Sequence, residues 1–263
     1  MRSAIFMIAL VLPLLAGCTR AQDARNQPRW EQLDSSEESS ASTLDNRSAA
    51  PAVQNPPSSI ALPRPQHSSK NALPSTFQIP VPFMSQAPHA NWDDPYQEAC
   101  EEASLLMVHR FLQGDKDGAI PPDDADRDLL ALIRWEENHG YGQDVTLTEL
   151  GDIAKNYYGF APVIEDTVTV ERIKELLVSG YPVIVPAAGR DLSNPYFSGE
   201  GPWYHMLVIT GYDRNEFIVN DPGTRRGEGY KYAYDVLIAA IHDWTGVKEE
   251  IRSGEKRMMI LKK

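Results

Sequence analysis

The stretch PYQEACEEASLLM, residues 95–107, contains Cys100, one of two cysteines in a chain of 263 residues. Small and apolar side chains recur here at three- to four-residue spacing, which predicts a helix over residues 99–112 with Cys100 in its first turn. Unpaired backbone N–H groups at a helix start lower the pKa of a thiol. Glu98, Glu101 and Glu102 work against this, because nearby negative charge raises the pKa. A lone helical cysteine is otherwise most often an inert core residue.

The other cysteine ends an apolar N-terminal run. One arginine precedes about a dozen apolar residues, and Leu15-Ala16-Gly17-Cys18 follows them. This layout is typical of a secretory signal and is too short to span a membrane as a mature helix. The ending resembles the bacterial lipobox, which implies removal of residues 1–17 and lipidation of Cys18. The alternative is an ordinary signal whose cysteine is lost or spare.

This interpretation bears on the remaining thiol and on location. If Cys18 carries lipid, Cys100 has no disulfide partner, and an unpaired thiol in an exported protein is either buried and inert or kept for reactivity. We expect a lipid-anchored protein of the bacterial cell envelope with its domain outside the cytoplasm. Thr19, rather than aspartate, resembles the outer-membrane form if the source has two membranes.

Composition divides the rest of the chain. Residues 18–76 are rich in Ser, Pro, Asn and Gln without a sustained apolar period, so we expect a disordered linker. Residues 77–263 have the length of one domain, expected to be a monomer. The whole chain has a net charge of −12. Arg2 is lost with the signal and the linker is neutral overall, so residues 77–263 have a net charge of −13. Such a surface excludes nucleic acid and anionic headgroups as specific partners.

The order of expected elements indicates an α+β domain with a mainly antiparallel sheet. Further helices are expected after Pro122, with Asp123 as cap and Gly140 as end, from the Thr146/Glu149 capping box to Gly159, from Thr169 to Gly180, and over 234–244. Strands are expected over 77–86, 182–187, 204–212 and 216–221, with an edge strand over 257–263.

His205 opens an apolar strand, and a hairpin behind it brings Asp221 back. With the turn centred on Asp213, Asp221 lies directly across from His205. A register shifted by two residues leaves them diagonal neighbours on one face, whereas a shift by one separates them. Both faces of this strand pair are apolar, so the hydrophobic pattern does not distinguish between these registers. The alternatives are a core histidine and a turn aspartate before Pro222-Gly223.

The other histidines fit a base for Cys100 less well. His109 faces away from Cys100 on the same helix. The remaining four lie in the linker, in a polar loop or at helix ends: His67, His89, His139 and His242. Gln86, Gln97 and the Cys100 backbone N–H are candidate oxyanion donors, although the place of Gln97 near the helix start favours a capping or solvated role for it. No metal or other cofactor is expected, since two cysteines and no H-E-x-x-H pattern supply no zinc ligands.

Four segments together resemble a known family: VPFMSQAPHANW (81–92), CEEASLLM (100–107), HMLVITGYD (205–213) and NDPG (220–223). They are similar to the peptidase domain related to bacteriocin-processing, double-glycine-cleaving cysteine peptidases, a group with the papain-like fold. The resemblance covers residues 79–244. It implies Cys100 as nucleophile, His205 as general base, Asp221 as the group that orients it, and Gln86 in the oxyanion hole.

The sequence departs from that family in two places. The common Cys-Gly-Pro is here Cys100-Glu101-Glu102, and Gln86 lies further upstream of the cysteine. The chain has neither a Walker motif nor a mature membrane span, so cleavage of double-glycine leaders is not implied.

The expected function is therefore an envelope-anchored cysteine peptidase that hydrolyses a peptide or amide bond. One alternative is a thiol acyltransferase that uses the same thioester. Another is a lipid-tethered binding module on an inactive peptidase fold, with an aromatic surface on the loop 189–204.

Overall fold

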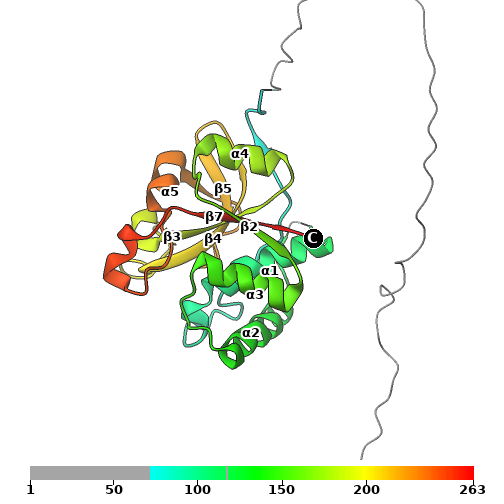
Figure 1. Ribbon diagram of the computed structural model, residues 1–263, viewed down its shortest axis with the longest axis vertical. Helices are drawn as coiled ribbons and strands as arrows, with labels where there is room; N and C mark the ends of the chain where they lie inside the picture. Colours follow the sequence, from blue (N-terminus) through cyan, green and yellow to red (C-terminus); the bar gives the residue numbers. More distant parts are fainter. Residues whose placement is uncertain (1–71, 117) are drawn as a thin grey trace, which may run out of the picture. The chain divides into compact units, whose positions relative to one another are not determined.

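A seven-stranded sheet organises the residues that the computed structural model describes, 72–116 and 118–263 (Figure 1). Its strands are β1 (Phe77–Gln78), β2 (Ala161–Glu165), β3 (Val183–Ala188), β4 (Tyr204–Tyr212), β5 (Glu216–Asn220), β6 (Tyr230–Ala233) and β7 (Met258–Lys262). The order is β2-β7-β3-β4-β5-β6, and β1 pairs with β4. Every pairing between these strands is antiparallel, as the sequence predicts. The predicted signal, Cys18 and most of the predicted linker lie outside the described residues.

Helices cover the sheet, with α1, α2 and α3 together on one side of the strands in Figure 1 and α4 and α5 on the other. The α-helices are α1 (Cys100–Gln113), α2 (Pro122–His139), α3 (Leu147–Tyr158), α4 (Val170–Val178) and α5 (Tyr234–Ala240). Short 3-10 helices are η1 (Tyr96–Glu98), η2 (Gly189–Leu192) and η3 (Lys248–Ser253).

The helix ends follow the sequence signals closely. The capping box of Thr146 and Glu149 opens α3, Thr169 caps α4, and Gly140 and Gly159 end their helices in the left-handed conformation. The predicted Asp123 cap is wrong. The helix begins at Pro122, two residues earlier than an Asp123 cap implies. The missing N–H of a proline costs nothing at that position, so Asp123 lies in the first turn.

Two strand predictions need correction. Of the segment 77–86 only Phe77–Gln78 pairs as a strand, because Pro80 and Pro82 have no N–H to donate to a ladder. The segment 257–263 is not an edge strand: β7 lies between β2 and β3, and four of its five residues are buried. The sequence pattern also missed β2 and β6, and α5 ends at Ala240 rather than at Trp244.

A bulge at Thr210 sets the register of the β4–β5 hairpin. Near the turn Tyr212 pairs with Phe217, but beyond the bulge Ile209 pairs with Val219. One extra residue in β4 reverses which face each later side chain occupies. Without the bulge, the end of β4 and the end of β5 would present their side chains to opposite faces of the sheet.

The bulge gives the predicted pair its shared face. His205 and Asp221 are diagonal neighbours, which is the second of the registers weighed above and not the direct pairing. Gly211, next to the bulge, leaves room for β1: a Cβ there would lie 2.5 Å from the Phe77 carbonyl oxygen. The Thr210 carbonyl turns to β1 and accepts the Ile79 N–H at 2.7 Å.

Candidate active site

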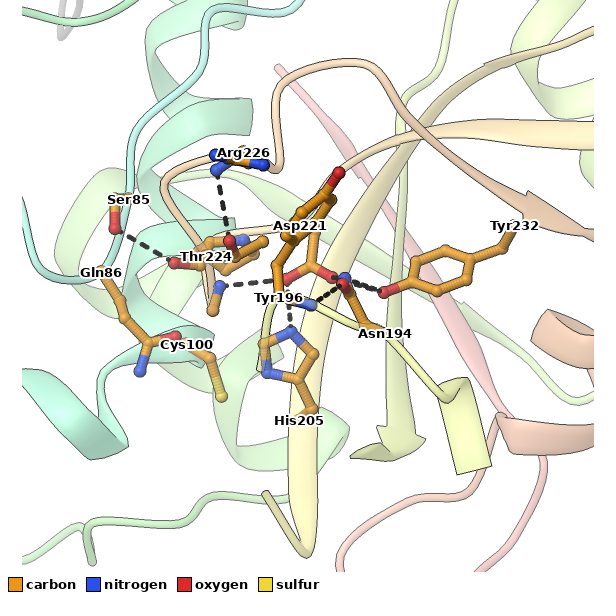
Figure 2. Close-up of polar contacts among 12 residues, drawn as sticks. Ser85, Gln86, Cys100, Asn194, Tyr196, His205, Asp221, Thr224, Arg226 and Tyr232 are labelled. Carbon is orange, nitrogen blue, oxygen red and sulfur yellow. Dashed lines mark hydrogen bonds and ion pairs between the residues drawn. The ribbon is translucent and has the colours of Figure 1, made fainter. Parts of the chain in front are cut away.

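Cys100, His205 and Gln86 line one cleft of about 750 Å³. Cys100 is the first residue of α1, and His205 is the second residue of β4. Asp221 follows β5 and lies next to the His205 ring, on its Nε2 side (Figure 2). Residues more than 100 positions apart in the chain thus meet at one wall of the cleft, because α1 packs against β4.

His205 and Asp221 form a buried hydrogen-bonded pair. His205 Nε2 lies 2.7 Å from Asp221 Oδ1, and their side chains are 1% and 0% exposed. Because Nε2 faces a carboxylate, it carries the ring proton, and Nδ1 is the nitrogen left for other chemistry. Figure 2 shows Nδ1 turned toward the Cys100 sulfur.

Three further donors hold the Asp221 carboxylate. Tyr232 Oη donates to Oδ2 at 2.6 Å, Asn194 Nδ2 donates to the same oxygen at 3.2 Å, and the Gly223 N–H donates to Oδ1 at 3.0 Å. Burial by itself raises the pKa of Asp221, but His205 and these donors outweigh it and lower the pKa. Asp221 is therefore an anion at neutral pH in spite of complete burial.

Tyr232 and Asn194 were not among the residues singled out from sequence. Tyr232 lies on β6, a strand that the sequence pattern did not predict, and Asn194 lies just beyond η2. Asn194 Nδ2 also lies 2.7 Å from Tyr232 Oη, so the two side chains brace each other. A buried asparagine and a buried tyrosine in two separate segments carry no sequence signal of their own, because only the fold brings them together.

Glycines in the loop after Asp221 allow the chain to pass very close to the site. A Cβ on Gly223 would lie 2.7 Å from His205 Cε1, and a Cβ on Gly227 would lie 1.8 Å from the Asp221 carbonyl oxygen. Phe197 packs its ring edge-on to the imidazole, with 5.3 Å between centroids and 79° between planes. The ring of His205 is thus confined on two sides as well as hydrogen-bonded.

The Cys100 thiol has a different environment from the one that helix position alone predicts. It is 5% exposed, and its sulfur donates to Glu101 Oε2 at 2.9 Å. Burial and the charge of Glu101 raise the pKa of the thiol well above its ordinary value, while the Met206 backbone acts weakly in the other direction. Burial, which the sequence did not predict, and the opposing effect of the glutamates, which it did, together raise the pKa of the thiol in spite of its place at the helix start.

Glu101 belongs to a buried group of carboxyls. Its side chain is 0% exposed, and its Oε1 accepts the Val145 N–H at 3.2 Å. Glu102 and Glu136 are each 3% exposed, and each keeps one oxygen without a hydrogen-bond partner among the described residues. Burial first, and like charge second, raises the pKa of Glu101 and of Glu136, and burial raises that of Glu102. These carboxyls therefore lose their protons only at a higher pH than ordinary glutamates.

Gln86 lies in the cleft wall, but its amide hydrogens are already used. Its Nε2 donates to the carbonyls of Tyr96 and Gln97, both at 2.9 Å, and its buried Oε1 has no partner among the described residues. Gln97 Nε2 donates to Asp94 on the exposed surface, in line with a solvated role. At the start of α1, the N–H groups of the first turn have no carbonyl four residues back within the helix.

The other described histidines lie away from the sulfur. His109 stacks on Tyr158 with 4.0 Å between ring centroids, on the face of α1 turned away from Cys100, as predicted. His89 pairs with Asp123 at 3.3 Å. Within residues 72–116 and 118–263, no group of three or more His, Cys, Asp or Glu side chains is placed to hold a metal ion. None of the helices in that part is long and apolar enough to cross a membrane.

A cysteine at a helix start, an imidazole with one nitrogen toward it, and a buried carboxylate on the other nitrogen form the constellation of thiol-dependent hydrolases. The model of the Peptidase_C39 like family matches residues 78–250 of this chain. The protein belongs to that family, which confirms the resemblance predicted from sequence, and its fold is the papain-like α+β fold.

A solved structure is similar to this chain. A solved C39-like peptidase candidate from Bacillus anthracis is 16% identical to this chain with a TM-score of 0.46, over 71% of this chain and 98% of that one. No curated protein matches the sequence.

Proposed function

We propose that this protein is a cysteine peptidase that hydrolyses peptide or amide bonds, with Cys100 as nucleophile, His205 as general base and Asp221 as the residue that orients His205. The observation that carries the proposal is the buried His205–Asp221 pair, 2.7 Å apart, which leaves Nδ1 free beside a cysteine in an open cleft. Membership of the Peptidase_C39 like family supports it.

The raised pKa of Cys100 decides how the reaction begins. The resting thiol is neutral, so His205 Nδ1 takes the proton as the sulfur attacks the substrate carbonyl. The resulting imidazolium is stabilised by Asp221, and it gives that proton to the amine as the C–N bond breaks. Water then attacks the thioester, loses a proton to His205, and releases the acid while the proton returns to sulfur.

The developing oxyanion needs donors at the start of α1. The Cys100 backbone N–H is one, since it lies in the first turn of the helix. Gln86 is the second, and it can serve only when one of its amide hydrogens leaves the carbonyl of Tyr96 or Gln97. When a substrate binds beside Cys100, its carbonyl oxygen becomes an alternative acceptor for that amide hydrogen. The hydrogen can then move from the backbone carbonyl to the substrate.

We place the enzyme on the envelope through a lipid on Cys18, with removal of residues 1–17. The support is the Leu15-Ala16-Gly17-Cys18 run after an apolar segment. Metabolic labelling with a fatty-acid analogue in a bacterial host tests it. We expect label on the chain and none on Cys18→Ser; equal labelling of both would contradict the anchor.

A non-enzymatic alternative has one observation in its favour. The Cys100 thiol already donates to Glu101 and its pKa is raised, which are the marks of an unreactive cysteine. In that case the cleft would bind peptides without cleaving them.

Peptide hydrolysis by the full-length chain separates these functions. We expect Cys100→Ala to abolish cleavage of a peptide mixture and of cell-wall peptides, and Cys18→Ser, the matched cysteine control, to retain it. Cleavage that persists in Cys100→Ala contradicts the nucleophile, and binding without cleavage supports the alternative. Products joined to an added amine, in place of free acids, would identify acyl transfer.

A further inference from the structure

The cleft carries positive charge on the loop that follows Asp221. Arg225 and Arg226 are exposed there and line the cleft together with Gly223 and Thr224. The domain as a whole has a net charge of −13, so two adjacent cations at the wall of the active site are opposite in sign to the overall charge. A long-range field of that sign repels anions, and only a local feature can attract one.

These two arginines differ from most others in having no acidic partner among the described residues. Six other arginines form salt bridges with Asp or Glu: Arg110, Arg127, Arg172, Arg190, Arg252 and Arg257. Neither Arg225 nor Arg226 forms one within residues 72–116 and 118–263. A guanidinium left without a carboxylate at the wall of a cleft is a site for a carboxylate from outside.

The Arg226 side chain is held in place for such a role. Its guanidinium carbon lies 4.8 Å from the centre of the Tyr196 ring (Figure 2). Its backbone N–H donates to Thr224 Oγ1 at 3.2 Å. Tyr196 is itself 46% exposed and lines the cleft. Stacking restricts a flexible side chain before the ligand arrives and so reduces the entropy lost on binding.

The remaining cleft charges leave no second place for an anion of this kind. Glu98 and Asp144 line another part of the cleft, where Lys248 lies 4.0 Å from Glu98. That lysine is thus offset by acidic neighbours, whereas the loop arginines are not. The distribution of charge within the cleft favours a carboxylate only beside the loop.

We infer that the cleft selects peptides with a carboxylate close to the scissile bond, bound by Arg225 and Arg226. The inference rests on the proposed hydrolysis. The loop begins at Asp221, whose partner His205 faces the reacting bond, and Arg225 and Arg226 line the same cleft as Cys100 and His205. The carboxylate therefore lies in the part of the peptide that binds beside this loop. It is either an acidic side chain or the terminal carboxylate of the peptide.

A peptide library read by mass spectrometry tests the inference while the substrate itself is still unidentified. The full-length chain is compared with the double variant Arg225→Gln/Arg226→Gln. The matched control is Arg214→Gln, because Arg214 is exposed, has no acidic partner among the described residues, and lies in the β4–β5 turn and not among the residues lining the cleft.

We expect Asp, Glu or a free C-terminus near the cleaved bond, and a kcat/KM about tenfold or more above that of the matching amide, as for a charged hydrogen bond. The double variant brings this ratio to about one, and Arg214→Gln keeps it. Loss of the preference on amidating the C-terminus assigns it to the terminal carboxylate; its survival assigns it to a side chain.

Two failures are distinguishable. Cys100-dependent cleavage without acidic preference, or a preference that the double variant retains, overturns this inference and leaves the peptidase intact. If no peptide is cleaved in a Cys100-dependent way, the proposed function fails and this inference fails with it.

Discussion

Two buried carboxyl groups flank the candidate active site, and they have opposite electrostatic states. Asp221 and Glu101 are both 0% exposed. Donors surround Asp221, and its pKa is lowered. Glu101 has the Cys100 thiol and one backbone N–H as donors and lies beside other carboxyls, so its pKa is raised well above the ordinary value. Equal burial therefore does not determine charge.

This difference shows that the number and kind of hydrogen-bond donors decide whether a buried acid is charged. Asp221 receives bonds from an imidazole, a phenol, an amide side chain and a backbone N–H. That set replaces the water lost on burial. The Glu101 group has unpartnered oxygens instead, at Glu102 and Glu136. One side of the site thus stabilises a cation on His205, and the other keeps the thiol protonated.

The largest expected effect comes from neutralising the charged side. Asp221→Asn retains the shape but removes the charge that holds His205 in its orientation, so we expect kcat to fall by about three to four orders of magnitude. Peptide hydrolysis measures it. The control is Asp152→Asn, an exposed position on α3. Nearly full activity in Asp221→Asn would remove the basis for the orienting role.

A smaller effect is expected from Tyr232→Phe, which deletes one donor and keeps the ring. Loss of the 2.6 Å hydrogen bond raises the pKa of Asp221. Asp221 is then protonated at a higher pH, so the acidic limb of the kcat/KM profile moves upward in pH and activity falls about tenfold. The matched control is Tyr230→Phe, since Tyr230 packs against the same ring. An unmoved acidic limb would show that Tyr232 is only structural.

The variant Glu101→Gln tests the side of the site that keeps the thiol protonated. Because the ionised form of Glu101 raises the pKa of the thiol, its replacement by a neutral isostere lowers that pKa. The midpoint of Cys100 alkylation against pH should therefore move to lower pH. Glu137→Gln, exposed at the end of α2, is the control. A midpoint that stays or rises would mean that Glu101 does not set the state of the thiol.

The smallest effect is expected from Glu136→Gln, and it is an effect on the stability of the folded protein. The folded-state pKa of Glu136 is raised above its unfolded value, mainly by burial. The folded protein then binds more protons than the unfolded one above about pH 4.5, and its stability falls as pH rises from there. The variant removes this penalty. We expect thermal unfolding a few degrees higher than wild type at pH 8, with the gap closing toward pH 4.5. A constant gap, or the same gain in Glu137→Gln, would contradict this.

Much of the site could be predicted because its elements are local. The position of Cys100 follows from the apolar spacing of one helix, and the caps of α3 and α4 follow from residues within one turn. The choice of His205 followed from its place at the start of an apolar strand. Asp123 and the segment 77–86 went wrong because proline imposes constraints that short patterns of polarity do not include.

The sequence by itself determined the fold class, the helix that carries Cys100, and the candidate trio of Cys100, His205 and Asp221. Only the tertiary structure decided that His205 and Asp221 share a face, because the bulge at Thr210 sets the register and the local pattern of neither strand marks it. It likewise decided the charge of each buried carboxyl. A pKa depends on donors from distant segments, such as Tyr232 and Asn194, and no local pattern encodes their meeting.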